Sequence, residues 1–280
     1  MVTGQTMSPR QVRANTISQG DFEFIREFMF GAAAIALEPA KTYLVQARLE
    51  MLARKEGFGS ATDVVTALRE DSTPELSQKV VDVMTTNETS FFRDPTVFEA
   101  LTNCILKHHT GPLRIWSAAC SSGQEPYSIA MQLREQRPDL VPHTRIHATD
   151  LSATMLHMAR QGSYSRLEVN RGLPALLLTR YFEKQGLRWT LKPEVRQHVK
   201  FAILNLALPW RQIGQFDIIF LRNVLIYFDV PTKQDVLKRV RRVLKPGGTL
   251  ILGAAETTLH LDGAYQRVQL GRSSGYQCAP

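Results

Sequence analysis

Short apolar runs alternate with helical patterns through the second half of the chain. Five of these runs are typical of β-strands, namely Leu113 to Ala118, Arg145 to Thr149, Val199 to Leu204, Phe216 to Leu221 and Thr249 to Gly253. Strands that alternate with helices form a parallel sheet with helices on both faces. The pattern therefore predicts a doubly wound α/β fold, closed by an antiparallel hairpin over Ala264 to Leu270 and Gly275 to Ala279.

The first part of the chain has a different pattern. Residues 1–18 are polar and aperiodic, which predicts a loose tail. Apolar residues then recur at helical spacing from Phe22 to Met84, as expected of a small all-helical domain. The predicted organisation is a tail over residues 1–18, an all-α domain over 19–85, a linker and lead-in over 86–112, and the α/β domain over 113–280.

Composition indicates a soluble protein of the reducing cytosol. Hydrophobic residues make up 44% of the chain, and no run reaches the ~18 apolar residues of a membrane span. The apolar stretch Phe28 to Leu37 follows acidic residues rather than a cationic start, so it predicts an internal helix and not a signal peptide. Cys104, Cys120 and Cys278 are odd in number and lack metal-ligand spacing. We therefore expect no disulfide framework, no metal and a cytoplasmic location.

The net charge of +8 is unevenly distributed. Residues 1–90 hold 9 Lys/Arg against 12 Asp/Glu, and residues 91–280 hold 25 against 14. Nine basic residues lie in the stretch 160–200: Arg160, Arg166, Arg171, Arg180, Lys184, Arg188, Lys192, Arg196 and Lys200. They predict a cationic surface, which either binds an anionic partner or is merely solvated, because charge alone carries no specificity.

Two features after the first strands favour a nucleotide-like cofactor. Six small residues, Ala118 to Gly123, connect the first strand to the helical segment Pro126 to Arg134. Small side chains let a cofactor approach the backbone at a helix N-terminus, although such a loop is often only a tight turn. Asp150 ends the second strand, where an acid in a doubly wound fold binds ribose hydroxyls or caps the next helix.

The later strand ends also carry polar residues. Asn205 and Leu206 follow the third strand, and Arg222 and Asn223 follow the fourth. Ligands bind at these carboxyl ends in this architecture. Leu244 to Gly248 predicts a turn whose glycines supply positive φ. Between the domains, the string Thr85 to Pro95 mixes polar residues with two aromatics, and its composition alone favours a packed linker.

Three strings carry a resemblance to a known family. They are Thr-Asn-X-Thr-X-Phe-Phe-Arg before residue 94, Trp116 to Ala119 continuing through Gly123 to Ile129, and Arg222 to Phe228. In order and spacing the chain resembles the chemotaxis receptor glutamate methyltransferases, the CheR proteins, over roughly residues 20–279. The resemblance implies a Rossmann-like class I methyltransferase domain with a small antiparallel β-subdomain inserted around residues 162–198.

The resemblance also implies a ligand set and a partner. S-adenosyl-L-methionine, with S-adenosyl-L-homocysteine as product, would be bound by Asn87, Thr89, Arg93, Glu125, Asp150, Asn205, Leu206, Arg222 and Asn223. Tyr227 would line the reacting end, and Arg93, Arg222 and Tyr227 would frame the catalytic site. The expected partner is the cytoplasmic helical domain of methyl-accepting chemotaxis proteins, bound by a monomer with no nucleic acid and no membrane insertion.

Two departures from the family pattern affect these expectations. Cys120 to Gln124 replaces a loop that is commonly richer in glycine, a mild change that cofactor binding should survive. The segment Tyr181 to Trp189 is short and has only Gly186, where members that bind a receptor's C-terminal pentapeptide have a longer glycine-rich turn. We therefore expect methylation without a pentapeptide tether, although an edge strand near Arg188 to Leu191 would offer its backbone to a peptide.

Two other functions remain as alternatives. The basic stretch 160–200 suggests an RNA methyltransferase, but its aromatic residues do not form an evident base-stacking series. A non-catalytic S-adenosylmethionine-binding scaffold is the second alternative. The complete set of expected ligand residues gives no support for lost catalysis.

Overall fold

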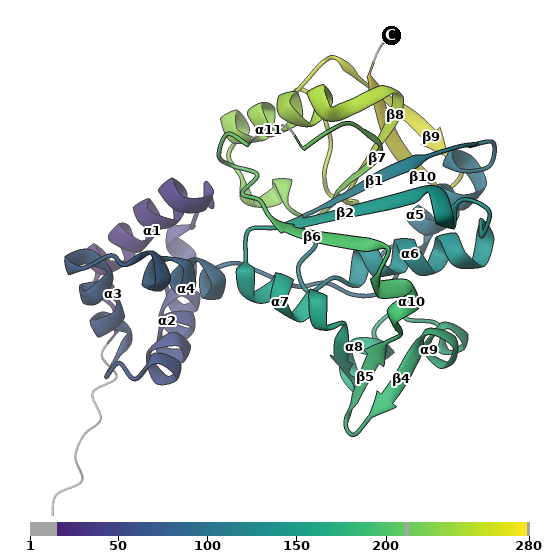
Figure 1. The fold of residues 1–280 in the computed structure, drawn as a ribbon. Coiled ribbons are helices and arrows are strands. Elements are labelled where there is room, and N and C mark those ends of the chain that lie inside the picture. Colours follow the sequence, from purple (N-terminus) through teal and green to yellow (C-terminus); the bar gives the residue numbers. More distant parts are fainter. Residues whose placement is uncertain (1–15, 211–212, 279–280) are drawn as a thin grey trace, which may run out of the picture. The chain divides into compact units, whose positions relative to one another are not determined.

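The computed structural model describes residues 16–210 and 213–278, which divide into two compact units (Figure 1). One unit contains the described residues up to Met29 together with Leu37–Met84, and the other contains Phe30–Ala36 and the chain from Thr85 onward. Most of the predicted tail lies outside the described residues. Ile17, near its end, is buried, and its N–H donates a hydrogen bond of 2.6 Å to the Gln46 side chain. No helix among the described residues is long and apolar enough to cross a membrane.

The first unit is helical, as its apolar spacing predicts. Its helices are α1 (Gln19–Ala33) as far as Met29, α2 (Thr42–Glu56), α3 (Ala61–Glu70) and α4 (Pro74–Met84), with a short η1 (Pro39–Lys41) before α2. Gly57, in the left-handed region with φ +82°, ends α2, and the Ser60 hydroxyl caps α3. The predicted helix over Phe28 to Leu37 extends only to Ala33, because Ala34 adopts a positive φ of 51°.

The second unit contains a seven-stranded sheet. Its strands are β1 (Leu113–Ala118), β2 (Thr144–Asp150), β6 (Val199–Ile203), β7 (Phe216–Leu221), β8 (Leu244–Leu252), β9 (Tyr265–Leu270) and β10 (Ser273–Cys278). Their order is β6-β2-β1-β7-β8-β10-β9. The first five in this order are parallel, and β10 is antiparallel to both β8 and β9. The predicted doubly wound sheet and its closing hairpin are confirmed, except that Ala279, the last predicted hairpin residue, lies outside the described residues.

Helices cover both faces of this sheet (Figure 1). The helices α5 (Pro95–Ala100), α6 (Gln124–Gln136) and α7 (Ala153–Gln161) lie on one face, and α11 (Val230–Val243) lies on the other. The π-helix η2 (Leu101–Ile105) continues α5. Successive residues of β7 alternate between the two cores: Ile218 and Phe220 join the α6 side, and Ile219 and Leu221 join the α11 side. Burial on both faces explains why the central strands β1 and β7 are predominantly apolar in the sequence.

A small subdomain is inserted between α7 and β6. It contains β3 (Ser163–Ser165), α8 (Arg166–Asn170), α9 (Ala175–Tyr181), β4 (Phe182–Gln185), β5 (Arg188–Leu191) and α10 (Pro193–Arg196). Its three strands form an antiparallel sheet in the order β3-β5-β4. The expectation that Arg188 to Leu191 is an edge strand is therefore wrong, because β5 is central and pairs on both sides.

The predicted turn over Leu244 to Gly248 is also wrong in part. Gly247 has the expected positive φ of 73°, but the whole segment is the start of β8. Leu244 pairs with Phe216, and the register then shifts before Ile218 pairs with Thr249. The extra residues form an irregularity within the ladder, so the strand begins before the glycines rather than after them.

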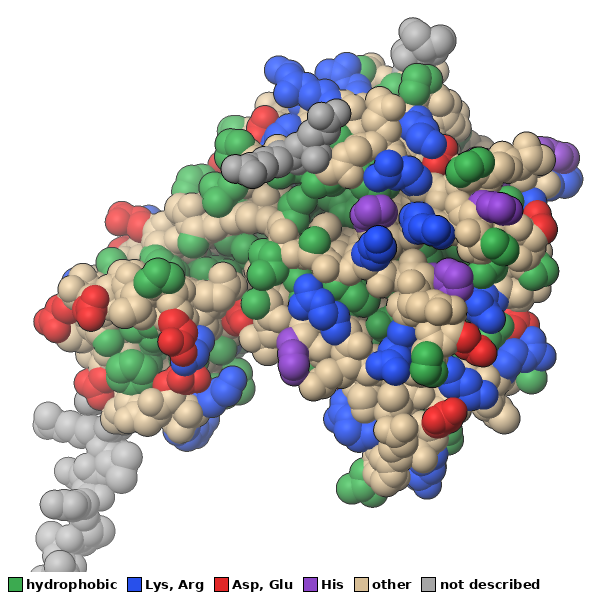
Figure 2. All heavy atoms as spheres, in the orientation of Figure 1, with side chains coloured by type: hydrophobic (Ala, Val, Ile, Leu, Met, Phe, Trp, Pro, Cys, Tyr) green, Lys and Arg blue, Asp and Glu red, His purple; other side chains and the backbone are tan. Residues whose placement is uncertain are grey.

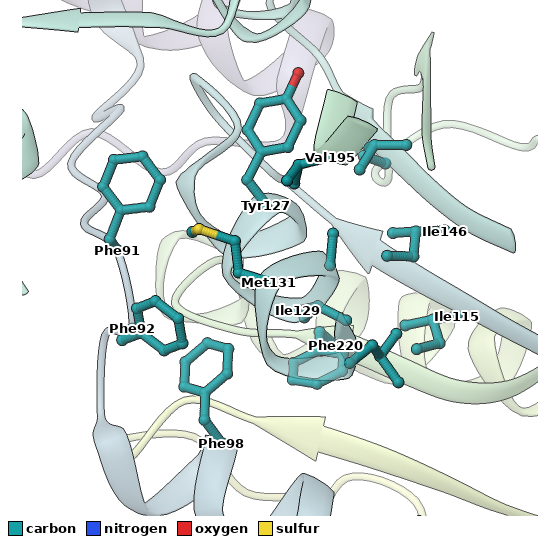
Figure 3. Packing of buried hydrophobic residues seen from close by; sticks show 14 of the residues in the cluster. Phe91, Phe92, Phe98, Ile115, Tyr127, Ile129, Met131, Ile146, Val195 and Phe220 are labelled. Carbon is teal, nitrogen blue, oxygen red and sulfur yellow. The ribbon is translucent and has the colours of Figure 1, made fainter. Parts of the chain in front are cut away.

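The string before α5 consists of residues Thr85 to Asp94. Its two aromatics, Phe91 and Phe92, belong to the core of the second unit (Figure 3). Phe91 is fully buried, and its ring centroid lies 5.0 Å from that of Tyr164 in an edge-to-face contact. The ring centroids of Phe92 and Phe98 lie 5.0 Å apart, and the Phe92 N–H donates to the buried Ser128 hydroxyl at 2.9 Å. This packing fixes the polar residues on either side of the aromatics.

Candidate active site

The loop after β1 turns sharply through small residues. Ala119, Ser121 and Gly123 all have positive φ, of 56°, 50° and 93°. A Cβ on Gly123 would lie 2.9 Å from the Ala159 Cβ and 3.2 Å from the Tyr127 ring, so only glycine lets α6 start this close to α7. The loop thus brings the N-terminus of α6, a favourable place for polar ligand groups, to the carboxyl end of the sheet.

Asp150 links the ends of β1 and β2. Its carboxylate accepts hydrogen bonds from the Ser121 N–H at 2.7 Å and the Ser152 N–H at 2.9 Å. The helix α7 is capped by the Ser152 hydroxyl, which accepts from the Met155 N–H at 3.1 Å. The alternative interpretation of Asp150 as the helix cap is therefore wrong.

Arg222 follows β7 and is almost entirely enclosed, with 1% of its side chain exposed. One guanidinium nitrogen lies 3.0 Å from the Glu125 carboxylate, and another contacts the Asp94 carboxylate and donates to the Arg93 carbonyl at 2.9 Å. Glu125 also accepts from the Ser117 hydroxyl at 2.7 Å. This buried ion pair joins the end of β7, the start of α6 and the string before α5.

The string itself lies along the β1 loop. The Asn87 carbonyl accepts from the Ser121 hydroxyl at 2.9 Å, and the Asn87 amide nitrogen lies 3.2 Å from the Thr85 hydroxyl. Arg93 donates to the Glu88 carbonyl at 3.2 Å. The Thr89 hydroxyl makes no hydrogen bond within residues 16–210 and 213–278, so its hydrogen-bonding capacity is available.

Asn205 and Leu206 follow β6, and both side chains contact other parts of the second unit. The Asn205 amide donates to the Ala32 carbonyl at 2.8 Å, and its oxygen accepts from the Ala207 N–H at 3.0 Å. Leu206 is buried in the core on the α11 side. Since Ala36 also donates its N–H to the Tyr227 carbonyl at 3.3 Å, the segment Phe30–Ala36 lies across the ends of β6 and β7.

Asn223 and Tyr227 complete the set of predicted residues. Asn223 has a positive φ of 57°, a conformation that asparagine tolerates better than most residues. Tyr227 is half-buried in η4 (Leu225–Tyr227). In the described parts of the chain, neither the Asn223 amide nor the Tyr227 hydroxyl has a hydrogen-bond partner.

Two residues of this region were missed by reasoning from the sequence. Asp94 pairs with Arg222. It lies within the string before α5, but it was not among the predicted site residues. Glu256 follows β8 and accepts backbone hydrogen bonds from the loop after β7. The strand-end rule that selected Asp150 and Asn223 applies equally to Glu256, but no motif marked it.

The electrostatics of the β1 loop exclude Cys120 as a nucleophile. Burial raises the pKa of the Cys120 thiol well above its usual value, and the negative charges of Asp150 and Glu125 raise it further. Cys120 is therefore a neutral thiol at physiological pH. Among the residues that the structure describes, no three His, Cys, Asp or Glu side chains are grouped to hold a metal ion.

Together these features define a class of protein: a doubly wound α/β protein whose polar residues gather at the carboxyl ends of the parallel strands, where this fold class binds nucleotide-type cofactors. Comparison with family models gives the family. The model described as "CheR methyltransferase, SAM binding domain" matches residues 87–273, and "CheR methyltransferase, all-alpha domain" matches residues 20–85. The chain belongs to the CheR methyltransferase family, and S-adenosylmethionine is its cofactor.

Curated relatives match over almost their whole length. "Chemotaxis protein methyltransferase Cher2" of Pseudomonas putida is 44% identical over 92% of this chain and 97% of its own. "Chemotaxis protein methyltransferase 1" of Pseudomonas aeruginosa is 44% identical over 90% of this chain and 95% of its own. The Escherichia coli "Chemotaxis protein methyltransferase" is 34% identical over 88% and 87%.

We expect Asp150→Ala to weaken the binding of S-adenosylhomocysteine by about 1 to 3 kcal/mol, because the predicted charge-assisted hydrogen bond between Asp150 and the ribose would be lost. Isothermal titration calorimetry measures this directly. Asp139→Ala is the control, since Asp139 is an exposed aspartate of the same unit that pairs with Arg137. Unchanged affinity in a folded Asp150→Ala protein would remove Asp150 from the site.

Proposed function

We propose that this protein forms methyl esters on glutamate side chains of chemotaxis receptors, with S-adenosylmethionine as the methyl donor. Membership of the CheR family and the names of the relatives support the reaction and the receptor substrate. The observation that carries the assignment is that the β1 loop, Asp150, Asn223 and the string before α5 meet at the carboxyl ends of the parallel strands. Hydrogen bonds join these elements through Ser121 and Arg222.

The residues present fit this cofactor. Asp150 is an acid at the end of the second strand, where a ribose is expected, and the β1 loop beside it consists of small residues. Thr89, Asn223 and Tyr227 have side-chain polar groups available for a ligand. In this proposal Asn87 and Arg93 contribute from the string, while Asn205 and Leu206 line the β6 end.

The reaction needs no general base from the protein. A glutamate side chain has a pKa near 4.3 and is already ionised at neutral pH. When bound, the cofactor supplies an activated methyl group on a sulfonium. The residues of this chain must therefore align the substrate carboxylate and exclude water, and alignment alone can lower a barrier by several kcal/mol.

Arg93 and Tyr227 are the residues that we assign to the reacting end. Arg222 was expected to frame the substrate with them, but its guanidinium is bound by Glu125 and Asp94. We therefore assign Arg222 to positioning. Arg222 therefore does not form a tight pair with the substrate carboxylate, which would stabilise the ground state as much as the transition state.

The inserted subdomain gives little support to the RNA alternative. Figure 2 shows Lys and Arg side chains over this subdomain, but several have internal partners. Arg180 pairs with Glu135, Arg171 pairs with Glu88, and Arg196 donates to the Gln161 carbonyl at 3.2 Å. Of the four aromatic residues in the stretch 160–200, Tyr164, Tyr181 and Phe182 are buried and so cannot stack on bases. Trp189 is partly buried and packs against the same core.

The receptor-binding face is proposed on α2. Its basic residues are Lys41, just before α2, and Arg48, Arg54 and Lys55 on α2, and we infer that they face the acidic helices of the receptor's cytoplasmic domain. The guanidinium of Arg48, however, donates to the Met84 carbonyl at the end of α4 and has a structural role. Arg54 and Lys55 are exposed, so the proposal rests on these two.

Charge reversal of both Arg54 and Lys55 to Glu should raise the KM for receptor about threefold to tenfold, because exposed ion pairs contribute little individually. The Kd for S-adenosylhomocysteine should stay the same. Arg26→Glu, on α1 of the same helical unit, is the control for a general loss of charge. An unchanged KM for the double variant would defeat the proposed face.

The reaction itself is tested with labelled S-adenosylmethionine and three acceptors: receptor cytoplasmic helices, the same helices without their last five residues, and total RNA. We expect label on both receptor forms, glutamyl methyl esters by mass spectrometry, and none on RNA. A tether acts only by raising effective concentration, and the short β4–β5 turn gives no extended glycine-rich edge for one.

Each outcome separates one alternative. Label on RNA alone would replace the proposed substrate class, and no label on any acceptor with intact cofactor binding would favour a scaffold. A tenfold loss of methylation on truncation, or micromolar binding of a receptor pentapeptide, would refute tether independence.

A further inference from the structure

The Glu256 carboxylate accepts four backbone hydrogen bonds at the edge of the candidate site. One oxygen accepts from the N–H groups of Asn223 and Gly253, both at 2.7 Å. The other accepts from Val224 at 2.9 Å and Leu225 at 2.8 Å. Three of these donors belong to the loop after β7, and the fourth belongs to the turn that carries Glu256 itself.

The sheet explains why these donors gather in one place. The strands β7 and β8 are parallel neighbours, and their last residues, Leu221 and Leu252, are paired. Beyond β7 the chain turns at Asn223 with φ +57°, so successive N–H groups point to one side. Such a concave group of backbone donors favours an anion, and the bonds are stronger for being made to a charge.

Gly253 makes the close approach possible. A Cβ at this position would lie 2.7 Å from the Asn223 side-chain nitrogen, 2.9 Å from its backbone nitrogen and 2.7 Å from the Glu256 carboxylate. The Glu256 N–H also donates to the Gly253 carbonyl at 2.9 Å, which closes the turn. A larger residue at position 253 would push the β7 loop away from the carboxylate.

We propose that Glu256 is a positioning residue for the cofactor: its carboxylate fixes the backbone from Asn223 to Leu225 in the conformation that binds S-adenosylmethionine. The inference rests on the proposed function, in which Asn223 is a cofactor ligand. Glu256 does not itself touch the reacting atoms in this proposal. It acts through the loop that carries Asn223 and leads to Tyr227.

The test compares Glu256→Gln with Glu99→Gln, which removes an exposed carboxylate of the same unit that pairs with Arg272. An amide replaces two acceptor oxygens with one, so the loop loses part of its anchorage. We expect the Kd for S-adenosylhomocysteine to rise about tenfold or more in Glu256→Gln and to stay unchanged in Glu99→Gln. Glu256→Asp, which keeps the charge on a shorter side chain, should fall between the wild type and Glu256→Gln.

Hydrogen exchange distinguishes positioning from a general loss of structure. Without cofactor, amides 223–225 should exchange faster in Glu256→Gln, while amides of β1 and β2 keep their protection. The KM for S-adenosylmethionine should rise while the KM for receptor stays constant. Gly253→Ala disturbs the same contact sterically and should shift the same amides and the same KM.

The outcomes separate this inference from the proposed function. If the wild type binds S-adenosylhomocysteine and folded Glu256→Gln binds it equally well, the role of Glu256 is overturned alone. If the wild type binds none, the proposed function falls, and the cofactor role of Glu256 falls with it. Loss of protection throughout β1 and β2 in both Glu256→Gln and Gly253→Ala would show a purely structural role and overturn the proposal.

Discussion

The candidate site depends on the ion pairs that the buried guanidinium of Arg222 makes with Glu125 and Asp94. An enclosed charge is costly unless it is paired, and here the carboxylates of Glu125 and Asp94 supply the pairing. Three segments distant in sequence must meet for this to happen: the end of β7, the start of α6 and the string before α5. The ion pair therefore specifies the arrangement of these segments, whatever its net effect on the free energy of unfolding.

Carboxylates fix the other strand ends through backbone donors. Asp150 accepts two N–H groups around the ends of β1 and β2, and Glu256 accepts four around the ends of β7 and β8. Ala119, Ser121 and Asn223 adopt positive φ where these loops turn. The loops are consequently held in place by hydrogen bonds and close packing, which favours a site preorganised for its cofactor.

The sequence predicted the central strands β1 and β7 well because both of their faces are buried. Leu113 to Ala118 and Phe216 to Leu221 are predominantly apolar, and their predicted bounds match β1 and β7. Long-range pairing was less accessible: nothing local in Arg188 to Leu191 indicates a central strand. Glu256 was missed for the same reason, because its partners Asn223 to Leu225 lie more than thirty residues earlier in the chain.

A crystal structure of this protein with S-adenosylhomocysteine tests the account most directly. The account predicts the ribose hydroxyls within hydrogen-bonding distance of the Asp150 carboxylate, beside Asn223 and the string before α5. It also predicts that Arg222 keeps its contacts with Glu125 and Asp94 and that Glu256 keeps its four backbone bonds. A ligand bound away from Asp150, or an Arg222 side chain released toward it, would contradict the account.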